Sequence, residues 1–545
     1  LFDRGFNYIG TSIMANNYIY KFGSLYYTLK RGDESKVKLK LLKYVGRVDS
    51  AMPTYSFLGI HGPYELLNGS GDYGDWCRKA KFFGVEVLGI CEKNTLAGVL
   101  KLRMECDKNG LGMVVGETVT VFNQKKDLLY DLKLYVSNEE GWENLLSINK
   151  VINVENGGRI DEVQLFPLLG GLVVVLDPKS LNFKDIPSEL LEGTYYQLDS
   201  VVFDDDNRDK SYLLNLQDYF SSSLLPTTIC DAYYLDQEYF FLKKTLNYIS
   251  GVSNDISRNQ HFKCSEEYIM EIRELFKEED QDTMIDIIEF AIDNTNQIAD
   301  KCKDFKIDLS HRHLPKYKMT EDQVKKYGTK EDLFLDLILE GLAGLHLEEE
   351  EFNKYSERLS TEIDVIKYGD VVDYFLILWD ITQWCTQQGI LVGFGRGSGC
   401  GSLVAYLLGL THINPFDYDL LFERFLNKGR VQVSLPDLDT DFEMARRPEV
   451  KKYMESRYGA DQVCSVGTYT TLQVKAAMRD LCRLEGVSVP EVTAFTSKLG
   501  DIDGMSDLFK VACQKKDVAY FIPKLLRPFS FFTASRNRNR FMLVP

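Results

Sequence analysis

The chain has 545 residues, with 64 Lys or Arg and 81 Asp or Glu, so its formal net charge is −17. This length exceeds what one hydrophobic core supports, and a composition that is 44% hydrophobic excludes wholesale disorder. The sequence has no apolar run long enough for a transmembrane helix and no charged-then-apolar signal peptide. The eleven Cys form no Cys-x-x-Cys pair, which is typical of free thiols in a reducing cytoplasm.

The charge is distributed unevenly along the chain. Residues 391–545 contain 21 basic and 17 acidic residues, a net +4, which leaves −21 for the first 390 residues. Basic clusters at 446–447, 451–452, 475–479 and 536–540 suit a phosphate-bearing partner, and ordinary surface charge is the alternative. The overall acidity argues only weakly against nucleic acid, because it averages two unlike parts.

The predicted elements begin with a small separate region over residues 1–50, with short strands at 25–29 and 37–45 and a turn at 31–33. From Tyr55 to Gly251, strand-like runs alternate with helix-like segments, which predicts an α/β domain with a largely parallel sheet. The strands are expected at 85–90, 113–115, 172–176 and 227–229, and the helices at 72–83, 141–154 and 237–249. Residues 265–365 are mostly helical by periodicity, with amphipathic stretches at 265–277 and 283–303 and an interruption at 313–317 around Pro315.

A glycine-rich loop at residues 393–402, GFGRGSGCGS, lies between an expected strand at 390–393 and an expected helix at 403–410. This order predicts a phosphate site, because glycine lets backbone N–H groups approach an anion and a helix N-terminus favours negative charge. Arg396 adds a forked guanidinium for phosphate oxygens. A tight structural turn is the alternative, since the loop lacks the Gly-Lys-Ser/Thr ending of a P-loop.

Three carboxylates alternate in the segment PDLDTDF, residues 436–442. On a strand, Asp437, Asp439 and Asp441 share one face, where their mutual repulsion requires a counter-ion. Aspartate oxygens suit Mg²⁺, and two such ions activate a hydroxyl and stabilise a leaving oxygen in phosphoryl transfer. An exposed acidic edge is the alternative. The carboxylates and the glycine loop together predict a nucleotidyl transferase.

These segments resemble the catalytic core of bacterial family C replicative DNA polymerases, the alpha subunits of DNA polymerase III. The matching strings are GFGRGSGCGSLVAYLLGL, LLFERFLN and PDLDTDF, with DYFLILWDITQW and HLPKY upstream and GTYTTLQVKAAMRDLCR downstream. Residues 55–250 resemble the family's polymerase-and-histidinol-phosphatase (PHP) domain through LLNGSGDYGDWCRKAKFFGVEVLGI, VVGETVTVF and GWENLLSINKV. The resemblance covers residues 55–530 and leaves residues 1–50 without a counterpart.

The resemblance implies a multidomain α/β fold, with a PHP-like α/β barrel followed by a nucleotidyltransferase-like palm and a helical thumb. The expected divisions are an unassigned extension at 1–50, a degenerate PHP-like domain at 51–254, a palm at 255–468, a thumb at 469–525 and a return to the palm at 526–545. The implied function is DNA-templated synthesis, in which a dNMP is added from a dNTP to a primer 3′-hydroxyl.

The resemblance also implies roles for individual residues. Asp437 and Asp439 match the catalytic aspartates that bind two Mg²⁺ ions, and Asp441 matches the third Asp of the string as a further metal ligand. The nucleotide-binding residues are expected to be Arg396, Gly397, Ser398, Arg424 and Arg430, with the placement of Arg430 affected by two extra residues in LNKGRVQVSLPD. Lys475 and Arg479 match DNA-binding positions on the thumb.

The PHP-like region departs from the family's metal cluster. The expected His-x-His is Gly59-Ile60-His61, the expected Thr-Asp-His is Cys91-Glu92-Lys93, and a later His is Tyr233. Only His61, Glu117 and Asp231 match the family, and the ammonium of Lys93 is expected to oppose a metal ion. We therefore expect an empty metal site and a structural relic rather than a working phosphoesterase.

The family's third palm carboxylate, fingers and clamp-binding parts have no counterpart before Pro545, so we expect this chain alone to be inactive. A truncated form, in a bacterium or a phage, is the first interpretation, and a split polymerase completed by a second polypeptide is the alternative. The expected partners are primer-template DNA and dNTPs in the bacterial or phage-infected cytoplasm, with a sliding clamp bound only through further C-terminal parts and no membrane. A non-catalytic DNA-binding scaffold and a metal-dependent phosphoesterase are the competing hypotheses.

Overall fold

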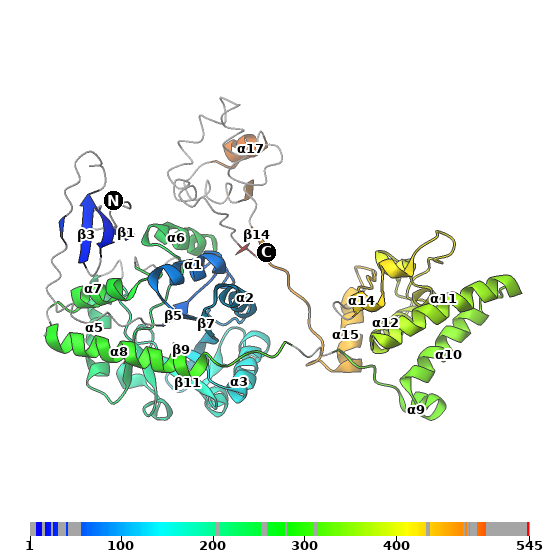
Figure 1. Ribbon diagram of the computed structural model, residues 1–545. Coiled ribbons are helices and arrows are strands. Elements are labelled where there is room, and N and C mark those ends of the chain that lie inside the picture. The colour runs from blue at the N-terminus through cyan, green and yellow to red at the C-terminus, as the bar shows by residue number, and fades with distance from the viewer. Residues whose placement is uncertain are drawn as a thin grey trace. The chain divides into compact units, whose positions relative to one another are not determined.

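A computed structural model describes residues 56–202, 206–251, 259–277, 279, 281–309, 314–431, 436–471, 475–476, 479 and 488–497, together with the short strands at 7–12, 17–22, 25–30, 40–41 and 542–543. The chain divides into two compact units (Figure 1). Unit 1 comprises residues 1–307 and 468–545, and unit 2 comprises residues 308–467. Among the described helices, none combines the length and apolar character that crossing a membrane requires.

The N-terminal strands form an antiparallel sheet in the order β1-β2-β3-β4. The strands are β1 (Asn7–Ser12), β2 (Asn17–Phe22), β3 (Leu25–Lys30) and β4 (Lys40–Leu41). The strand expected at 25–29 is therefore confirmed. Of the strand expected at 37–45, the structure describes only Lys40–Leu41, which form β4. The turn expected at 31–33 lies outside the described residues.

Two sheets in unit 1 are joined at both edges into a barrel-like ring. One sheet is parallel and contains β5 (Phe57–Ile60), β6 (Val87–Ile90) and β7 (Gly112–Val114). The other has the order β10-β8-β9-β11-β12-β13, with bounds Ile160–Asp161, Gly116–Asn123, Leu128–Val136, Leu172–Leu176, Tyr195–Gln197 and Leu225–Thr227. Ala232, beyond β13, pairs with Ile60, while the Val136 N–H donates to the Val115 carbonyl at 2.9 Å.

The second sheet is mixed, but most strand pairs of the two sheets are parallel, which agrees with the expectation of a largely parallel sheet. β8 and β9 form an antiparallel hairpin, and β9 also pairs antiparallel with β11. This hairpin was not predicted, although the alternation of polar and apolar residues in GETVTVFN and LLYDLKLYV is typical of half-buried strands. The strands β11, β12 and β13 are parallel, so their carboxyl ends meet at one edge.

Helices surround the ring in unit 1. They are α1 (Tyr73–Phe83), α2 (Val99–Asn109), α3 (Glu139–Lys150), α4 (Glu162–Leu165), α5 (Asp206–Phe220), α6 (Phe240–Ile249), α7 (Ser265–Leu275) and α8 (Gln281–Cys302). Unit 1 also contains α17 (Val489–Ser497). Asp72 caps α1 by accepting a hydrogen bond from the Gly74 N–H, as expected for a helix that begins there. Ile288 and Ile292 of α8 join the core of unit 1, so this unit extends beyond the division placed at residue 254.

Unit 2 is largely helical. It contains α9 (Glu321–Tyr327), α10 (Lys330–Ala343), α11 (Glu349–Tyr368), α12 (Val372–Gln387), α13 (Leu403–Leu407), α14 (Lys428–Val431) and α15 (Arg447–Tyr458). Phe334, Ile366 and Phe375 form the centre of its core, and Leu403 and Val404 of α13 pack into it. This packing fixes the segment that follows the glycine loop.

The strands expected on both sides of the unit 2 site are absent from the described residues. Val392 and Phe442 form only an isolated antiparallel bridge, and residues 436–441 have no strand structure. The expectation that Asp437, Asp439 and Asp441 lie on a strand is therefore wrong. The bridge nevertheless brings the start of the glycine loop beside the aspartate segment.

A substitution at Trp76 tests the packing of the unit 1 core. Trp76 is fully buried and stacks on Phe262, with ring centroids 5.7 Å apart. Trp76→Ala should lower the free energy of unfolding by about 3–5 kcal/mol, as expected for a large core side chain. Phe82→Ala on the same helix is the matched control, because Phe82 is 57% exposed and its removal should cost less than about 0.5 kcal/mol. Denaturant titration measures both, and equal destabilisation would contradict this packing.

Candidate functional site

Polar side chains in unit 1 gather where parallel strands end. His61 follows β5, Cys91 follows β6, and Asp231 lies shortly after β13. Asp177 and Asp199 also follow strands, β11 and β12 respectively. The carboxyl ends of parallel strands commonly carry the functional groups of α/β folds, so this is the place where a site is expected.

Asp231 is the centre of this cluster, and both of its carboxylate oxygens contact cations. Oδ1 lies 2.8 Å from the Lys133 Nζ and 2.9 Å from the His61 Nε2. Oδ2 lies 2.5 Å from the Lys179 Nζ, which also pairs with Asp199 at 2.8 Å. Although burial opposes a charged Asp, these cations hold the pKa of Asp231 well below its usual value.

His61 is held between two carboxylates. Its Nδ1 lies 2.5 Å from the Glu65 Oε2, on the other side of the ring from Asp231. Burial lowers the pKa of His61, but its interactions with Cys91, Glu65 and Asp231 outweigh burial and raise this pKa well above 6.5. In return, the charge and hydrogen bond of His61 overcome burial and lower the pKa of Glu65 to about 2. The imidazole is therefore a cation in this cluster.

These residues do not fit a metal ion, although His61, Cys91 and Asp231 present ligand atoms within 4.8 Å of one another. A metal ligand must offer a free electron pair, whereas both ring nitrogens of His61 face carboxylates and both oxygens of Asp231 contact ammonium groups. Lys133 and Lys179 bring positive charge to the position where a metal would have to bind. Neither lysine was predicted at this site, although Lys133 carried a signal, because it is a charged residue within the strand sequence LLYDLKLYV.

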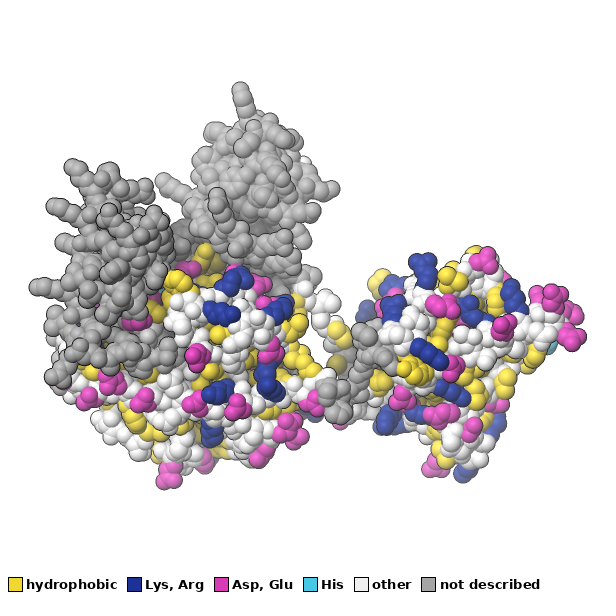
Figure 2. Space-filling view, in the orientation of Figure 1, with side chains coloured by type: hydrophobic (Ala, Val, Ile, Leu, Met, Phe, Trp, Pro, Cys, Tyr) yellow, Lys and Arg dark blue, Asp and Glu magenta, His cyan; other side chains and the backbone are white. Residues whose placement is uncertain are grey.

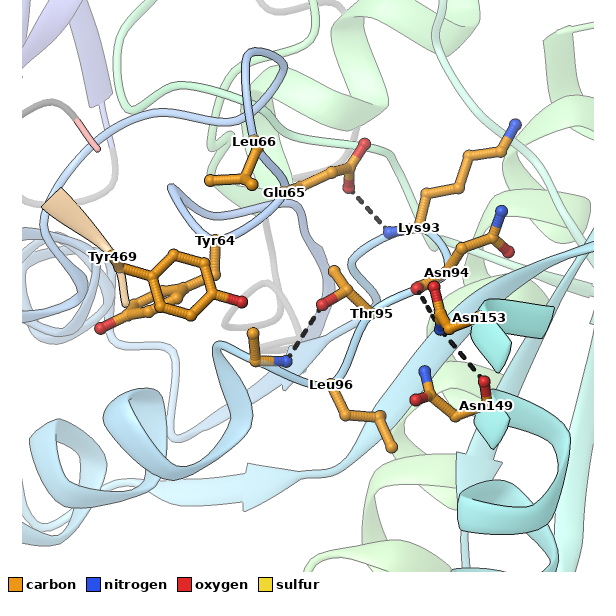
Figure 3. Close-up of a pocket in the computed structure, with 11 residues that line it drawn as sticks. Tyr64, Glu65, Leu66, Lys93, Asn94, Thr95, Leu96, Asn149, Asn153 and Tyr469 are labelled. Atoms are coloured by element: carbon orange, nitrogen blue, oxygen red, sulfur yellow. Dashed lines mark hydrogen bonds between the residues drawn. The ribbon is translucent and has the colours of Figure 1, made fainter. Parts of the chain in front are cut away.

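Lys93 was expected to oppose a metal ion at this cluster, but its ammonium group points to another carboxylate. Its ammonium group pairs with Asp131 at 2.7 Å and is 40% exposed, so it does not face Asp231. The Lys93 backbone N–H donates to Glu65 at 2.9 Å, and Figure 3 shows the side chain extending away from that carboxylate. The cations that oppose a metal are therefore Lys133 and Lys179.

A cavity of about 530 Å³ opens beside this cluster, between Tyr64, Lys93 and Tyr469 (Figure 3). Asn149 lines the cavity and donates a hydrogen bond to the buried Glu117 at 2.7 Å. The other oxygen of Glu117 has no hydrogen-bond partner among the described residues. Glu117 thus lies apart from His61 and Asp231, and burial raises its pKa to about 8.

In unit 2 the glycine loop packs directly on the aspartate segment. The Gly393 N–H donates to the Asp441 carbonyl at 2.8 Å. Gly397 has a φ of 71°, and a Cβ there would lie 2.9 Å from the Asp439 Oδ2. Glycine is needed at this position for both its conformation and its contact. The fold therefore brings together two motifs that lie about forty residues apart in the sequence.

Arg396 links these motifs electrostatically. Its guanidinium lies 3.2 Å from the Asp439 Oδ1 and 3.4 Å from the Asp441 Oδ1, while Asp437 is exposed. The carboxylates of Asp439 and Asp441 are 37% and 62% exposed, so water and ions reach them. These exposed oxygen donors fit a hard cation such as Mg²⁺, and Arg396 provides positive charge beside them.

The helix after the glycine loop does not offer its N-terminus to an anion, which corrects the expected phosphate contact. The buried carboxylate of Glu362 accepts hydrogen bonds from the Leu403 N–H at 3.0 Å and the Val404 N–H at 3.1 Å. The Ala405 N–H donates to the Ser402 hydroxyl. The first amides of α13 are therefore already satisfied within the protein.

The remaining predicted residues lie on the surface. Arg424 and Arg430 are exposed, and Arg430 donates to the Arg424 carbonyl at 2.9 Å. Among the described residues, neither guanidinium bonds to the glycine loop or the aspartates. Lys475 and Arg479 are helical, with Lys475 half-buried and Arg479 exposed. Figure 2 shows basic and acidic side chains interspersed on the visible face of both units.

Two family models match the chain. Residues 58–165 match the PHP domain, and residues 332–525 match the bacterial DNA polymerase III alpha NTPase domain. The glycine loop, the aspartates and Lys475 all lie in the second match, whereas His61 and Glu117 lie in the first.

Several curated relatives are similar over most of this chain. DNA polymerase III subunit alpha of Bacillus subtilis is 28% identical over 83% of this chain and 40% of the relative. The subunits of Borreliella burgdorferi and Escherichia coli K12 are 30% and 31% identical, over 82% and 80% of this chain and 40% and 38% of each relative. The chain thus spans about two fifths of the length of these relatives. A putative metal-dependent phosphoesterase from Bifidobacterium adolescentis is matched over 33% of this chain and 87% of its own, with 11% identity and a TM-score of 0.24, too low to assign the fold.

Lys179→Met should strongly destabilise unit 1, because it leaves the buried carboxylates of Asp199 and Asp231 without this cation. The expected loss in unfolding free energy is about 3–5 kcal/mol. Lys126→Met is the matched control, since Lys126 is 43% exposed and pairs with Asp185 at 3.1 Å, a surface interaction worth less than about 1 kcal/mol. If the two variants have the same stability in denaturant titrations, the lysine cluster does not support the fold.

Glu117→Gln should reduce the loss of stability at alkaline pH. Burial raises the pKa of Glu117 from 4.5 to about 8, so between these values the folded chain holds a proton that the unfolded chain has released. Folding stability therefore falls as pH rises through this window, by about 3–5 kcal/mol for this group. The stability of Glu117→Gln relative to the unmodified chain should increase from pH 5 to pH 8. Glu86→Gln, at an exposed position, should show no such trend, and a flat difference for Glu117→Gln would contradict the assignment.

Proposed function

We propose, from the premise that the chain belongs to the bacterial DNA polymerase III alpha family, that it takes part in DNA-templated DNA synthesis as an N-terminal portion of such a polymerase. The reaction is two-metal nucleotidyl transfer from a dNTP to a primer 3′-hydroxyl. The observation that carries this proposal is the contact of the glycine loop with Asp439, with Arg396 between the two aspartates.

In this function Asp437 and Asp439 hold Mg²⁺, with Asp441 as a further ligand. When bound, the ions activate the attacking hydroxyl and neutralise the developing phosphate charge. The Asp439 carboxylate lies close to Gly397, where a Cβ would be 2.9 Å from Oδ2, and it pairs with Arg396 at 3.2 Å at the edge of the loop. Exposed oxygens and hard-cation chemistry support this assignment.

The incoming triphosphate binds at the exposed part of the glycine loop, at Arg396, Gly397 and Ser398. Arg396 compensates Asp439 and Asp441, and its forked donors also suit phosphate oxygens. Arg424 and Arg430 add positive charge for the nucleotide from a neighbouring surface. Residues 308–467, which form unit 2, correspond to the palm. The segment that carries Lys475 and Arg479 belongs to the thumb, where these side chains contact the DNA backbone.

The PHP-like domain has a structural role in this account and acts without a metal. Lys133 and Lys179 supply to Asp231 the positive charge that metal ions would otherwise provide. This argues against a phosphoesterase site at His61 and Asp231. We infer that a further polypeptide segment, either continuous with this chain or separate, supplies the fingers, the third carboxylate and the clamp contact. The site is assembled in the bacterial or phage-infected cytoplasm.

Asp439→Asn should abolish Mg²⁺-dependent incorporation of dNTPs when the chain is combined with the remaining part of a family polymerase. The rate should fall at least about a thousandfold, because several kcal/mol of metal-derived stabilisation are lost at about 1.4 kcal/mol per tenfold. Asp336→Asn on α10 is the control, as that carboxylate is 41% exposed and has only a 3.8 Å pair with Lys326. Primer extension measures both variants, and retained incorporation in Asp439→Asn would remove this aspartate from the site.

A further inference from the structure

We propose that Glu362, held by Arg358, is the positioning residue of the glycine loop, an inference that rests on the proposed nucleotide function of that loop. Glu362 lies on α11, forty residues before the loop ends, and is fully buried. No catalytic or nucleotide-binding role is assigned to it, because its carboxylate faces the backbone of the loop rather than the exposed surface.

Both oxygens of the Glu362 carboxylate accept hydrogen bonds from Arg358 and from residues 402–404. Its Oε1 accepts from the Leu403 N–H at 3.0 Å and from the Arg358 Nε at 2.7 Å. Its Oε2 accepts from the Ser402 hydroxyl at 2.9 Å and from the Val404 N–H at 3.1 Å. A buried carboxylate in this geometry fixes both ends of the turn between the loop and α13.

Arg358 extends the same support to the next segment. Its Nη2 donates to the Gly401 carbonyl at 2.8 Å and to the Leu420 carbonyl at 3.1 Å. The approach is close here, since a Cβ on Gly401 would lie 2.8 Å from the Leu421 carbonyl oxygen. Arg358 and Glu362, which we call the α11 brace, therefore tie the loop end to the segment that precedes Arg424.

The brace decides which amides remain for a phosphate. The N–H groups of residues 403–405 are satisfied by Glu362 and Ser402. Among the described residues, the N–H groups of Gly395, Arg396 and Gly397 form no backbone or side-chain hydrogen bond, and Arg396 and Gly397 are exposed. An anion that binds backbone N–H groups of this loop must therefore bind before residue 402.

Positioning by the brace has a measurable consequence. If the loop end is released, the exposed amides and Arg396 no longer keep their place relative to Asp439, and misplacement by about 1 Å can cost about a hundredfold in activity. Glu362→Gln should have this effect, because an amide nitrogen cannot accept the N–H and hydroxyl donors that now face the carboxylate. The overall fold should change less than the loop, since Leu403 and Val404 stay packed in the core.

The test uses the full chain with inorganic tripolyphosphate and Mg²⁺ as the probe. In Glu362→Gln we expect the dissociation constant for tripolyphosphate, measured by calorimetry, to rise at least about tenfold. We also expect faster hydrogen exchange of the amides at 403–405. Glu362→Asp retains the charge at a shorter reach and should be intermediate in both measurements. Glu357→Gln is the matched control, because Glu357 is exposed on the same helix and should leave binding and exchange unchanged.

The outcomes separate this inference from the proposed function. Unchanged binding and unchanged exchange in Glu362→Gln would overturn the positioning role. If Glu362→Gln fails to fold, Glu362→Asp decides, and full retention of binding and protection in that variant would also overturn it. If the unmodified chain binds no tripolyphosphate, the proposed nucleotide function fails, while accelerated exchange at 403–405 would still support the brace.

Discussion

A carboxylate removed from water must find a positive or hydrogen-bonding partner, and both units are arranged around this requirement. In unit 1 Asp231 is enclosed by Lys133, Lys179 and a protonated His61. In unit 2 Glu362 is matched by Arg358 and by backbone N–H groups. The same requirement is met differently at Asp439 and Asp441, which stay exposed and accessible to ions.

This difference distinguishes the buried, internally neutralised cluster around Asp231 from the accessible carboxylates of Asp439 and Asp441. The unit 1 cluster lies at the strand ends where α/β folds commonly place function, yet its carboxylates are neutralised by the chain itself. The unit 2 carboxylates have one partly exposed arginine between them and a glycine loop against them. The unit 1 carboxylates are therefore neutralised within the chain, whereas the oxygens of Asp439 and Asp441 remain accessible to ions.

Local patterns predicted local features well. The helix that Asp72 caps, the strand at 172–176 and the amphipathic helices near 265–303 agree with α1, β11, α7 and α8. Features that depend on distant contacts were not predicted. Neither the position of Lys179 beside Asp231 nor the hydrogen bonds of Glu362 have a local signature, because their partners are brought close only by the fold. The aspartates were expected on a strand from their spacing, but contacts with the glycine loop hold them in irregular backbone.

Metal binding by the intact chain tests the central claim most directly. Equilibrium dialysis against Mn²⁺ and dATP, followed by elemental analysis, measures the metal retained by the protein. Binding should be lost in the Asp437→Asn, Asp439→Asn double variant and preserved in Asp231→Asn, because the unit 1 carboxylate is occupied by Lys133 and Lys179. Loss of Mn²⁺ in Asp231→Asn with retention in the double variant would contradict the account and place the metal site in unit 1.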